Sequence, residues 1–118
     1  LAQANVLRLP FYPGICTPTD IELALEHDMK FLKFYPAEAS GGLKMLSALY
    51  DPYAHRELRF MPTGGISPEN LKAYLEHPAV FAVGGTWMVP KNLINQQDWS
   101  AIESLTRQAV KIAGEAGT

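Results

Sequence analysis

Residues 31–50 read FLKFYPAEASGGLKMLSALY, and this stretch decides the fold class. It opens with a short apolar run, Phe31–Tyr35, which is rich in aromatic residues and ends at Pro36, as is typical of a β-strand. From Gly42 onward, leucines recur at helical spacing, which indicates an amphipathic helix. The stretch therefore predicts one strand followed directly by one helix.

The same order of strand and helix recurs along the rest of the chain. Short apolar runs bounded by proline or glycine predict four strands, at Val6–Tyr12, Phe31–Tyr35, Leu58–Met61 and Val80–Val83. Capping residues and apolar periodicity predict four helices, starting at Thr17-Pro18-Thr19-Asp20, at Gly42, at Ser67-Pro68-Glu69-Asn70 and at Trp99, the last ending near Ala113.

Alternating strands and helices predict an α/β domain with a parallel sheet. Four such units are half of a TIM (β/α)8 barrel, and the alternative is an open flavodoxin-like sheet, for which the strand count is slightly short. The 118 residues suffice for one domain, so residues 1–118 are expected to form a single partial barrel. Because the chain begins with Leu1 and enters a strand-like run almost at once, we expect its N-terminal half to lie elsewhere.

The composition argues against several classes of partner. Ten Lys and Arg, scattered along the chain, against twelve Asp and Glu give a net charge of −2, so neither nucleic acid nor an anionic membrane is an expected partner. One cysteine and three widely separated histidines predict no disulfide and no metal site. Since no apolar run approaches the roughly 18 residues of a membrane span and no signal-peptide pattern is visible, we expect a cytoplasmic protein.

Lys33 interrupts the aromatic strand Phe31–Tyr35. Alternation along a strand puts Lys33 on one face together with Phe31 and Tyr35, and the two residues between them on the other. A desolvated lysine loses its proton more readily, and its neutral amine is then a nucleophile toward carbonyl groups. The alternative is a lysine at a strand end that extends its ammonium group into solvent, which is the commoner case.

Two pairs of glycines follow the last two predicted strands. Gly64-Gly65 stands between a strand and a capped helix, and Gly84-Gly85 repeats the arrangement before Thr86. Paired glycines let the backbone approach a ligand and direct N–H groups at an anion. In (β/α) barrels the loops after the last two strands commonly bind phosphate, so this pattern favours a phosphate site over two tight turns.

Four motifs carry a resemblance to a known family: Pro13-Gly14-Ile15-x-Thr17, Lys33-Phe34-Tyr35-Pro36-Ala37-Glu38-Ala39-x-Gly41-Gly42, Pro62-Thr63-Gly64-Gly65-Ile66 and Gly84-Gly85-Thr86-Trp87. In this order and spacing they resemble the KDPG/KHG aldolases, from about Leu9 to Ala113. The resemblance implies the C-terminal half of a (β/α)8 barrel that forms trimers, acts in the Entner–Doudoroff pathway and needs no cofactor. It implies reversible cleavage of 2-keto-3-deoxy-6-phosphogluconate (KDPG) to pyruvate and glyceraldehyde 3-phosphate, and in many members cleavage of 2-keto-4-hydroxyglutarate (KHG).

The resemblance also assigns residues. Lys33 matches the lysine that forms the Schiff base. The implied substrate-binding residues are Tyr35, where the family usually has phenylalanine, Thr63, Gly64, Gly65, Gly85 and Thr86, where many members have serine. Glu38 belongs to the motif as well, and a structural role in the loop is as plausible as a catalytic one.

The family's general acid/base, a glutamate, and its carboxylate-binding arginine lie in the half of the barrel that this sequence does not contain. We therefore expect a class I aldolase, a carbon–carbon lyase, whose 118-residue segment is inactive by itself. The alternatives are a barrel aldolase for a related keto acid, and a non-catalytic phosphate-binding half-barrel or assembly module.

Overall fold

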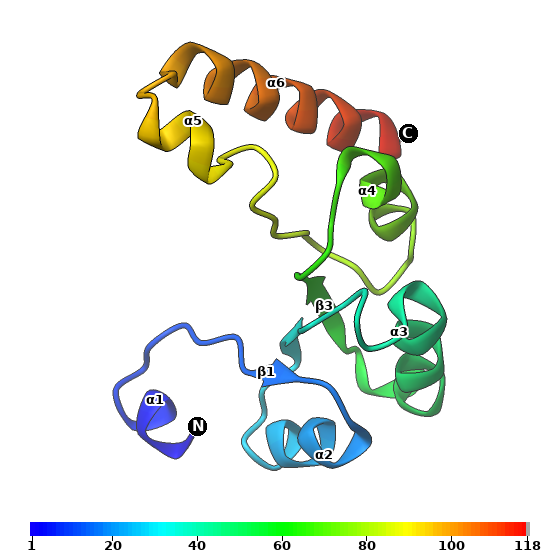
Figure 1. The fold of residues 1–118 in the computed structure, drawn as a ribbon. Coiled ribbons are helices and arrows are strands. Elements are labelled where there is room, and N and C mark those ends of the chain that lie inside the picture. Colours follow the sequence, from blue (N-terminus) through cyan, green and yellow to red (C-terminus); the bar gives the residue numbers. More distant parts are fainter. Residues whose placement is uncertain (118) are drawn as a thin grey trace.

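Residues 1–117 are described in a computed structural model; Thr118, the last residue of the predicted domain, lies outside the described residues. The strands are β1 (Gly14–Ile15), β2 (Phe31–Phe34) and β3 (Arg59–Pro62). The helices are α1 (Ala2–Val6), α2 (Pro18–Glu26), α3 (Gly42–Tyr50), the 3-10 helix η1 (Asp51–Arg56), α4 (Pro68–Leu75), α5 (Lys91–Asn95) and α6 (Trp99–Ala116). Figure 1 shows that the amino and carboxyl ends lie at opposite ends of the molecule.

The three strands form one parallel sheet in the order β1-β2-β3, which confirms the predicted α/β class. Lys33 of β2 pairs with Gly14 on one side and with Met61 on the other. Side chains alternate along β2 as predicted, because Leu32 and Phe34 are fully buried whereas Lys33 is only half-buried on the opposite face.

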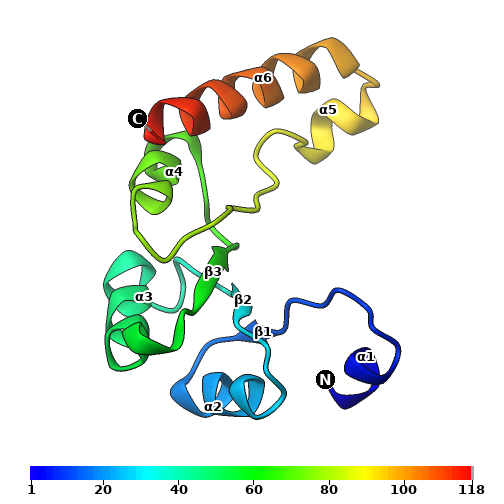
Figure 2. The same cartoon turned by 180° about the vertical axis from the view of Figure 1, so that it is seen from behind.

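The hydrophobic core lies between the sheet and the helices α2, α3 and α4, which Figures 1 and 2 show along the same side of the strands. Each helix contributes its apolar stripe to this core, with Ile21 from α2, Leu46 from α3 and Leu71 from α4 all at least nine-tenths buried. Among the described residues no helix covers the other face of β2, where Phe31 and Tyr35 are exposed. The residues of the candidate site lie on this open face.

Two of the four predicted strands are corrected by the structure. Val6–Tyr12 is not a strand: α1 extends to Val6, and residues 7–13 are irregular. Pairing with β2 begins only at the Pro13 carbonyl, which accepts from the Lys33 N–H at 2.9 Å. Pro10 and Pro13 have no N–H for a sheet ladder, which explains why an apolar run here does not form a strand.

The second correction concerns Val80–Val83, which contributes only an isolated bridge between Val80 and Phe60. The segment still follows β3, since the Phe81 N–H donates to Phe60 at 3.1 Å and the Gly84 N–H donates to Pro62 at 3.0 Å. No described strand pairs with its outer edge, so the ladder does not become regular. Two predicted strands, Phe31–Tyr35 and Leu58–Met61, therefore correspond to β2 and β3, whereas the first strand lies at Gly14–Ile15 and Val80–Val83 is only a bridged segment.

The predicted helix starts are confirmed. Thr17 caps α2 in a capping box with Asp20, whose carboxylate accepts from the backbone N–H groups of Cys16 and Thr17 at 2.9 Å each. Both hydrogen bonds lower the pKa of Asp20, and the one from the Cys16 N–H has the larger effect. The last helix continues beyond the predicted Ala113 to Ala116, and η1 and α5 were not predicted.

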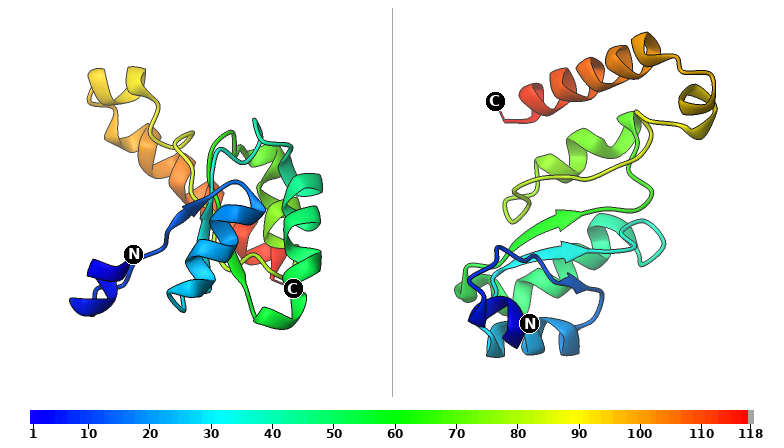
Figure 3. Two further views of the ribbon diagram at one scale, coloured as in Figure 1. Left: turned by 90° about the horizontal axis from the view of Figure 1, so that it is seen from below. Right: turned by 90° about the vertical axis from the view of Figure 1, so that its left-hand side faces the viewer.

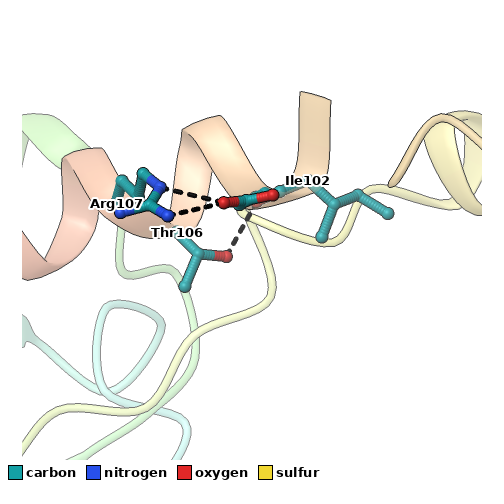
Figure 4. Close-up of polar contacts among 4 residues, drawn as sticks. Ile102, Thr106 and Arg107 are labelled. Atoms are coloured by element: carbon teal, nitrogen blue, oxygen red, sulfur yellow. Dashed lines mark hydrogen bonds and ion pairs between the residues drawn. The ribbon is translucent and has the colours of Figure 1, made fainter. Parts of the chain in front are cut away.

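Helix α6 packs against α4 at the end of the molecule away from α1 and α2 (Figure 3). Its exposed side carries an i, i+4 ion pair in which Arg107 donates to Glu103 Oε1 at 3.0 and 2.7 Å (Figure 4). Nearby, the Thr106 hydroxyl donates to the Ile102 carbonyl at 2.8 Å. None of the helices in the described part of the chain combines the length and apolar character needed to cross a membrane.

Candidate active site

A cavity of about 390 Å³ opens at the carboxyl ends of β2 and β3. It is lined by Lys33, Tyr35, Thr63, Gly64, Gly65, Ile66, Gly84, Gly85 and Thr86. The volume lies in the range usual for small-molecule sites. All seven residues that the sequence singled out for catalysis or substrate binding are among these lining residues, although they come from three separate segments of the chain.

Lys33 extends its side chain from the open face of β2 into this cavity. Its Nζ lies 5.0 Å from the centroid of the Tyr35 ring, a distance at which a cation interacts with an aromatic face. Within residues 1–117 no carboxylate lies within ion-pair distance of Lys33 Nζ. The amine is therefore open to the cavity rather than held in a salt bridge.

The Gly64-Gly65 turn follows β3 and needs both of its glycines. Gly64 has φ +96° and Gly65 has φ +80°, a region that other residues rarely adopt. A Cβ at Gly64 would lie 3.2 Å from the Tyr35 ring, and one at Gly65 would lie 2.6 Å from Glu38 Cβ. The backbone can therefore pass close to the β2–α3 loop only because neither residue has a side chain.

The second glycine pair, Gly84-Gly85, also lines the cavity, and neither glycine has room for a side chain. A Cβ at Gly84 would lie 2.5 Å from Thr63 Cγ2, and one at Gly85 would collide with the ring of Trp87. Thr86 follows and is exposed at the rim of the cavity. At both glycine pairs, main-chain atoms without a side chain therefore line the same cavity as Lys33.

Thr63 lies between the two glycine pairs. Its N–H donates to the Phe34 carbonyl at 2.9 Å, which fixes the end of β3 against β2. Its hydroxyl is buried and has no hydrogen-bond partner among the described residues. A buried hydroxyl without a partner costs about 1–3 kcal/mol, so a ligand atom that bonds to it would recover much of that energy.

Sequence analysis missed the residues behind the cavity. Tyr74 Oη donates to Glu38 Oε1 at 2.5 Å, and Asn70 Nδ2 donates to the Gly65 carbonyl at 3.0 Å. Tyr74 and Asn70 stand four residues apart on α4, and this spacing was the only available signal. This spacing puts both residues on one face of α4, but it could not indicate that Tyr74 pairs with a residue 36 positions away.

A second hollow of about 380 Å³ shares Lys33 and Tyr35 with the first and is completed by Gly14, Ile15, Cys16 and Asp20. Lys33 therefore borders open space on two sides. No group of three or more His, Cys, Asp or Glu residues with the spacing of a metal site occurs in the described part of the chain.

Comparison with known proteins places these features in a family. The family model described as "KDPG and KHG aldolase" matches residues 1–105. The chain belongs to the KDPG and KHG aldolase family. It is 47% identical over 106 residues to the 2-dehydro-3-deoxy-phosphogluconate aldolase of Haemophilus influenzae, covering 90% of this chain and 49% of that protein. It is 42% identical over 111 residues to the KHG/KDPG aldolase of Escherichia coli K12, covering 94% of this chain and 51% of that protein.

Solved structures of family members have the same fold over the matched part. The KDPG aldolase of Zymomonas mobilis with 3-phosphoglycerate matches with a TM-score of 0.81 and 36% identity, over 90% of this chain and 48% of that one. The KDPG aldolase of Legionella pneumophila, with pyruvate captured as a covalent carbinolamine intermediate, matches with a TM-score of 0.77 and 37% identity. The match covers 82% of this chain and 46% of that one. The chain spans about half the length of the KDPG and KHG aldolases it matches.

Proposed function

We propose that this chain supplies the Schiff-base lysine and the phosphate site of a class I aldolase that cleaves KDPG to pyruvate and glyceraldehyde 3-phosphate. One observation carries the proposal: Lys33, whose amine forms no ion pair within the described residues, and the backbone of two glycine pairs line the same cavity. An amine suits the keto end of such a substrate, and glycine N–H groups suit its phosphate end.

The relatives support this assignment. Several are named as aldolases for KDPG or for both KDPG and KHG, at 41–47% identity. In the Legionella enzyme pyruvate is held as a covalent carbinolamine, and the Zymomonas enzyme was crystallised with 3-phosphoglycerate, a phosphorylated three-carbon acid. Covalent addition to a keto acid and tolerance of a phosphorylated ligand are the two properties that the cavity of this chain would need.

The reaction begins when the neutral amine of Lys33 attacks the C2 ketone of KDPG. A carbinolamine forms and loses water, which leaves an iminium ion. When the C4 hydroxyl gives up its proton, the C3–C4 bond breaks and its electron pair moves into the iminium. Glyceraldehyde 3-phosphate leaves, and the enamine that remains is protonated at C3 and hydrolysed to pyruvate, which frees Lys33.

The other lining residues have matching roles in this proposal. Gly64, Gly65 and Gly85 offer backbone N–H groups to the phosphate, and the Thr86 hydroxyl adds a donor. Thr63 offers its unpaired buried hydroxyl to the substrate chain between the keto and phosphate ends. The ring of Tyr35 packs beside the imine. Holding both ends of the substrate positions the C2 ketone for attack.

We further propose that residues 1–118 form the C-terminal half of a (β/α)8 barrel in a longer cytoplasmic protein that assembles as a trimer and also accepts KHG. On the face of β2 that carries Lys33, the exposed rings of Tyr12, Phe31 and Phe81 pack together with centroids 5.2–6.1 Å apart. Closing the barrel would cover this aromatic cluster. The general acid/base would come from the other half, so the segment alone is expected to be a poor catalyst.

The test is to trap the imine in the protein that carries this sequence. Pyruvate with borohydride should leave a reduced adduct on the peptide that contains Lys33, detected by mass spectrometry. Lys33→Arg should abolish both the adduct and turnover, because a guanidinium stays protonated. Lys44→Arg, on the exposed side of α3, is the matched control and should retain both. An adduct on Lys30 or Lys44 would remove Lys33 from the mechanism.

A further inference from the structure

Two loops form the walls of the candidate site, and backbone hydrogen bonds join them. They are the β2–α3 loop, residues 35–41, and the β3–α4 loop, residues 63–67. The Ala37 N–H donates to the Thr63 carbonyl at 2.8 Å, and the Glu38 N–H donates to the Gly64 carbonyl at 3.1 Å. The direction of the Gly64-Gly65 turn is therefore set by the loop that follows Lys33.

Glu38 adds a side-chain connection to these backbone bonds. The stem of Glu38 packs so closely on Gly65 that a Cβ there would lie 2.6 Å from Glu38 Cβ. The Glu38 carboxylate accepts from Tyr74 Oη at 2.5 Å, and Tyr74 is only 1% exposed. The hydrogen bond thus anchors the β2–α3 loop to the buried side of α4.

Helix α4 also holds the turn from its other side. Asn70 Nδ2 donates to the Gly65 carbonyl at 3.0 Å, and Asn70 Oδ1 accepts from the Ser67 N–H at 2.9 Å. Residues 70 and 74 lie on the same face of the helix. The Gly65 backbone is therefore held between Asn70 of α4 and Glu38, which is itself tied to Tyr74 of the same helix.

The chemistry of the Glu38–Tyr74 pair suits a permanent structural bond rather than proton transfer. Burial, together with the hydrogen bond to Glu38, raises the pKa of Tyr74, so its hydroxyl remains a donor at neutral pH. A hydrogen bond to a charged acceptor is stronger than one between neutral groups. Glu38 Oε1 also faces Gly42, where a Cβ would lie 3.2 Å away, and Glu38 does not line the cavity of Lys33.

We propose that Glu38 and Tyr74 are positioning residues: their hydrogen bond holds the Gly64-Gly65 turn at a fixed place relative to Lys33 and so makes the site selective for phosphorylated keto acids. This inference rests on the aldolase function proposed above, because it assigns the turn to the phosphate group. It predicts that breaking the bond harms the phosphate end of the site and leaves imine formation at Lys33 intact.

The test compares Tyr74→Phe with Tyr53→Phe in the protein that carries this sequence. Both substitutions remove only a hydroxyl, and Tyr53 is a matched control because its Oη donates to Glu22 Oε1 at 2.7 Å in an exposed pair that lines neither hollow beside Lys33. Three quantities are measured: KM for KDPG, the affinity for inorganic phosphate followed through the NMR signals of the Gly64 and Gly65 amides, and the rate at which the pyruvate–borohydride adduct forms.

For Tyr74→Phe we expect KM for KDPG and the dissociation constant of phosphate each to rise about ten-fold, the effect of losing one hydrogen bond to a charged group. The rate of adduct formation should stay at the wild-type value, and Tyr53→Phe should change none of the three quantities. Glu38→Ala should behave like Tyr74→Phe. Glu38→Gln, which keeps an acceptor for Tyr74, should restore part of the phosphate affinity.

Unchanged phosphate affinity in Tyr74→Phe would overturn the inference. So would a loss of adduct formation in the same proportion as the loss of phosphate affinity, because that result would show a general effect on folding. Failure of the proposed aldolase function is a separate result. If the wild-type protein forms no adduct at Lys33, the phosphate titration still decides whether Glu38 and Tyr74 hold the turn.

Discussion

Gly65→Ala tests whether the turn after β3 depends on the absence of a side chain. The residue has φ +80°, and a left-handed conformation costs a non-glycine residue about 1–2 kcal/mol. The new methyl group would also lie 2.6 Å from Glu38 Cβ, and relieving such a contact in a packed region costs about 1–3 kcal/mol. We therefore expect unfolding to become easier by about 2–5 kcal/mol.

The same chain offers a control of opposite sign. Gly114 lies within α6, and a Cβ there would meet no atom within 4 Å. Alanine is preferred over glycine inside helices by about 0.5–1 kcal/mol, so Gly114→Ala should stabilise the protein. The two substitutions add the same methyl group, and only the backbone conformation and the surroundings of the glycine differ.

The assay is urea denaturation of both variants together with KM for KDPG and for KHG. Gly65→Ala should lower the midpoint and raise KM for KDPG, because a displaced turn no longer directs its N–H groups at the phosphate. Gly114→Ala should raise the midpoint and leave both KM values unchanged. A loss of less than about 1 kcal/mol in Gly65→Ala would refute the steric reasoning, since strain and contact together require more.

Two further predictions concern the rim of the site and the half-buried His77. Thr86→Val should weaken binding of KDPG by about 1–3 kcal/mol and of KHG much less, which the ratio of the two KM values measures; equal losses would contradict a role in phosphate binding. Burial lowers the pKa of His77, whose Nδ1 accepts from the Ala79 N–H at 3.1 Å. Below pH 6.5 the unfolded chain therefore binds more protons at His77 than the folded chain does. The free energy of unfolding should be constant with respect to His77 above pH 6.5 and should decrease as the pH falls below that value. His77→Gln should flatten this acid dependence in urea denaturation, whereas His55→Gln, on exposed η1, should leave it in place.

Local sequence patterns predicted the parts of the fold that depend on local forces. The capping sequence at Thr17 needs only its own neighbours, and it starts α2 as expected. Alternation placed Lys33 on the face opposite Leu32 and Phe34, because the direction of side chains along a strand is fixed by backbone geometry. The resemblance to the KDPG and KHG aldolases implied that Lys33 and both glycine pairs belong to one site, and all of them line one cavity in the structure.

Patterns failed where tertiary contacts decide the outcome. Val6–Tyr12 has the apolar content of a strand, but Pro10 within it and Pro13 after it limit pairing, and Phe11 and Tyr12 remain exposed. The hydrogen bond between Glu38 and Tyr74 joins the β2–α3 loop to helix α4, and neither residue type indicates its partner. Such contacts depend on how α4 packs against the sheet, which no local window of sequence describes.

The loops of the candidate site pack directly against one another, so a change in one loop is expected to affect the others. Gly65 lacks a side chain where the stem of Glu38 lies, and Gly84 lacks one where the methyl group of Thr63 lies. Each glycine thus makes room for a residue of a preceding strand-end loop while exposing its own backbone to the cavity of Lys33. Substitutions in groups that share contacts are not additive. A double variant such as Gly65→Ala with Glu38→Ala should consequently lose less stability than its single variants predict, because Glu38→Ala removes Cγ, which would lie 2.7 Å from the new methyl group, and leaves only the contact with Cβ.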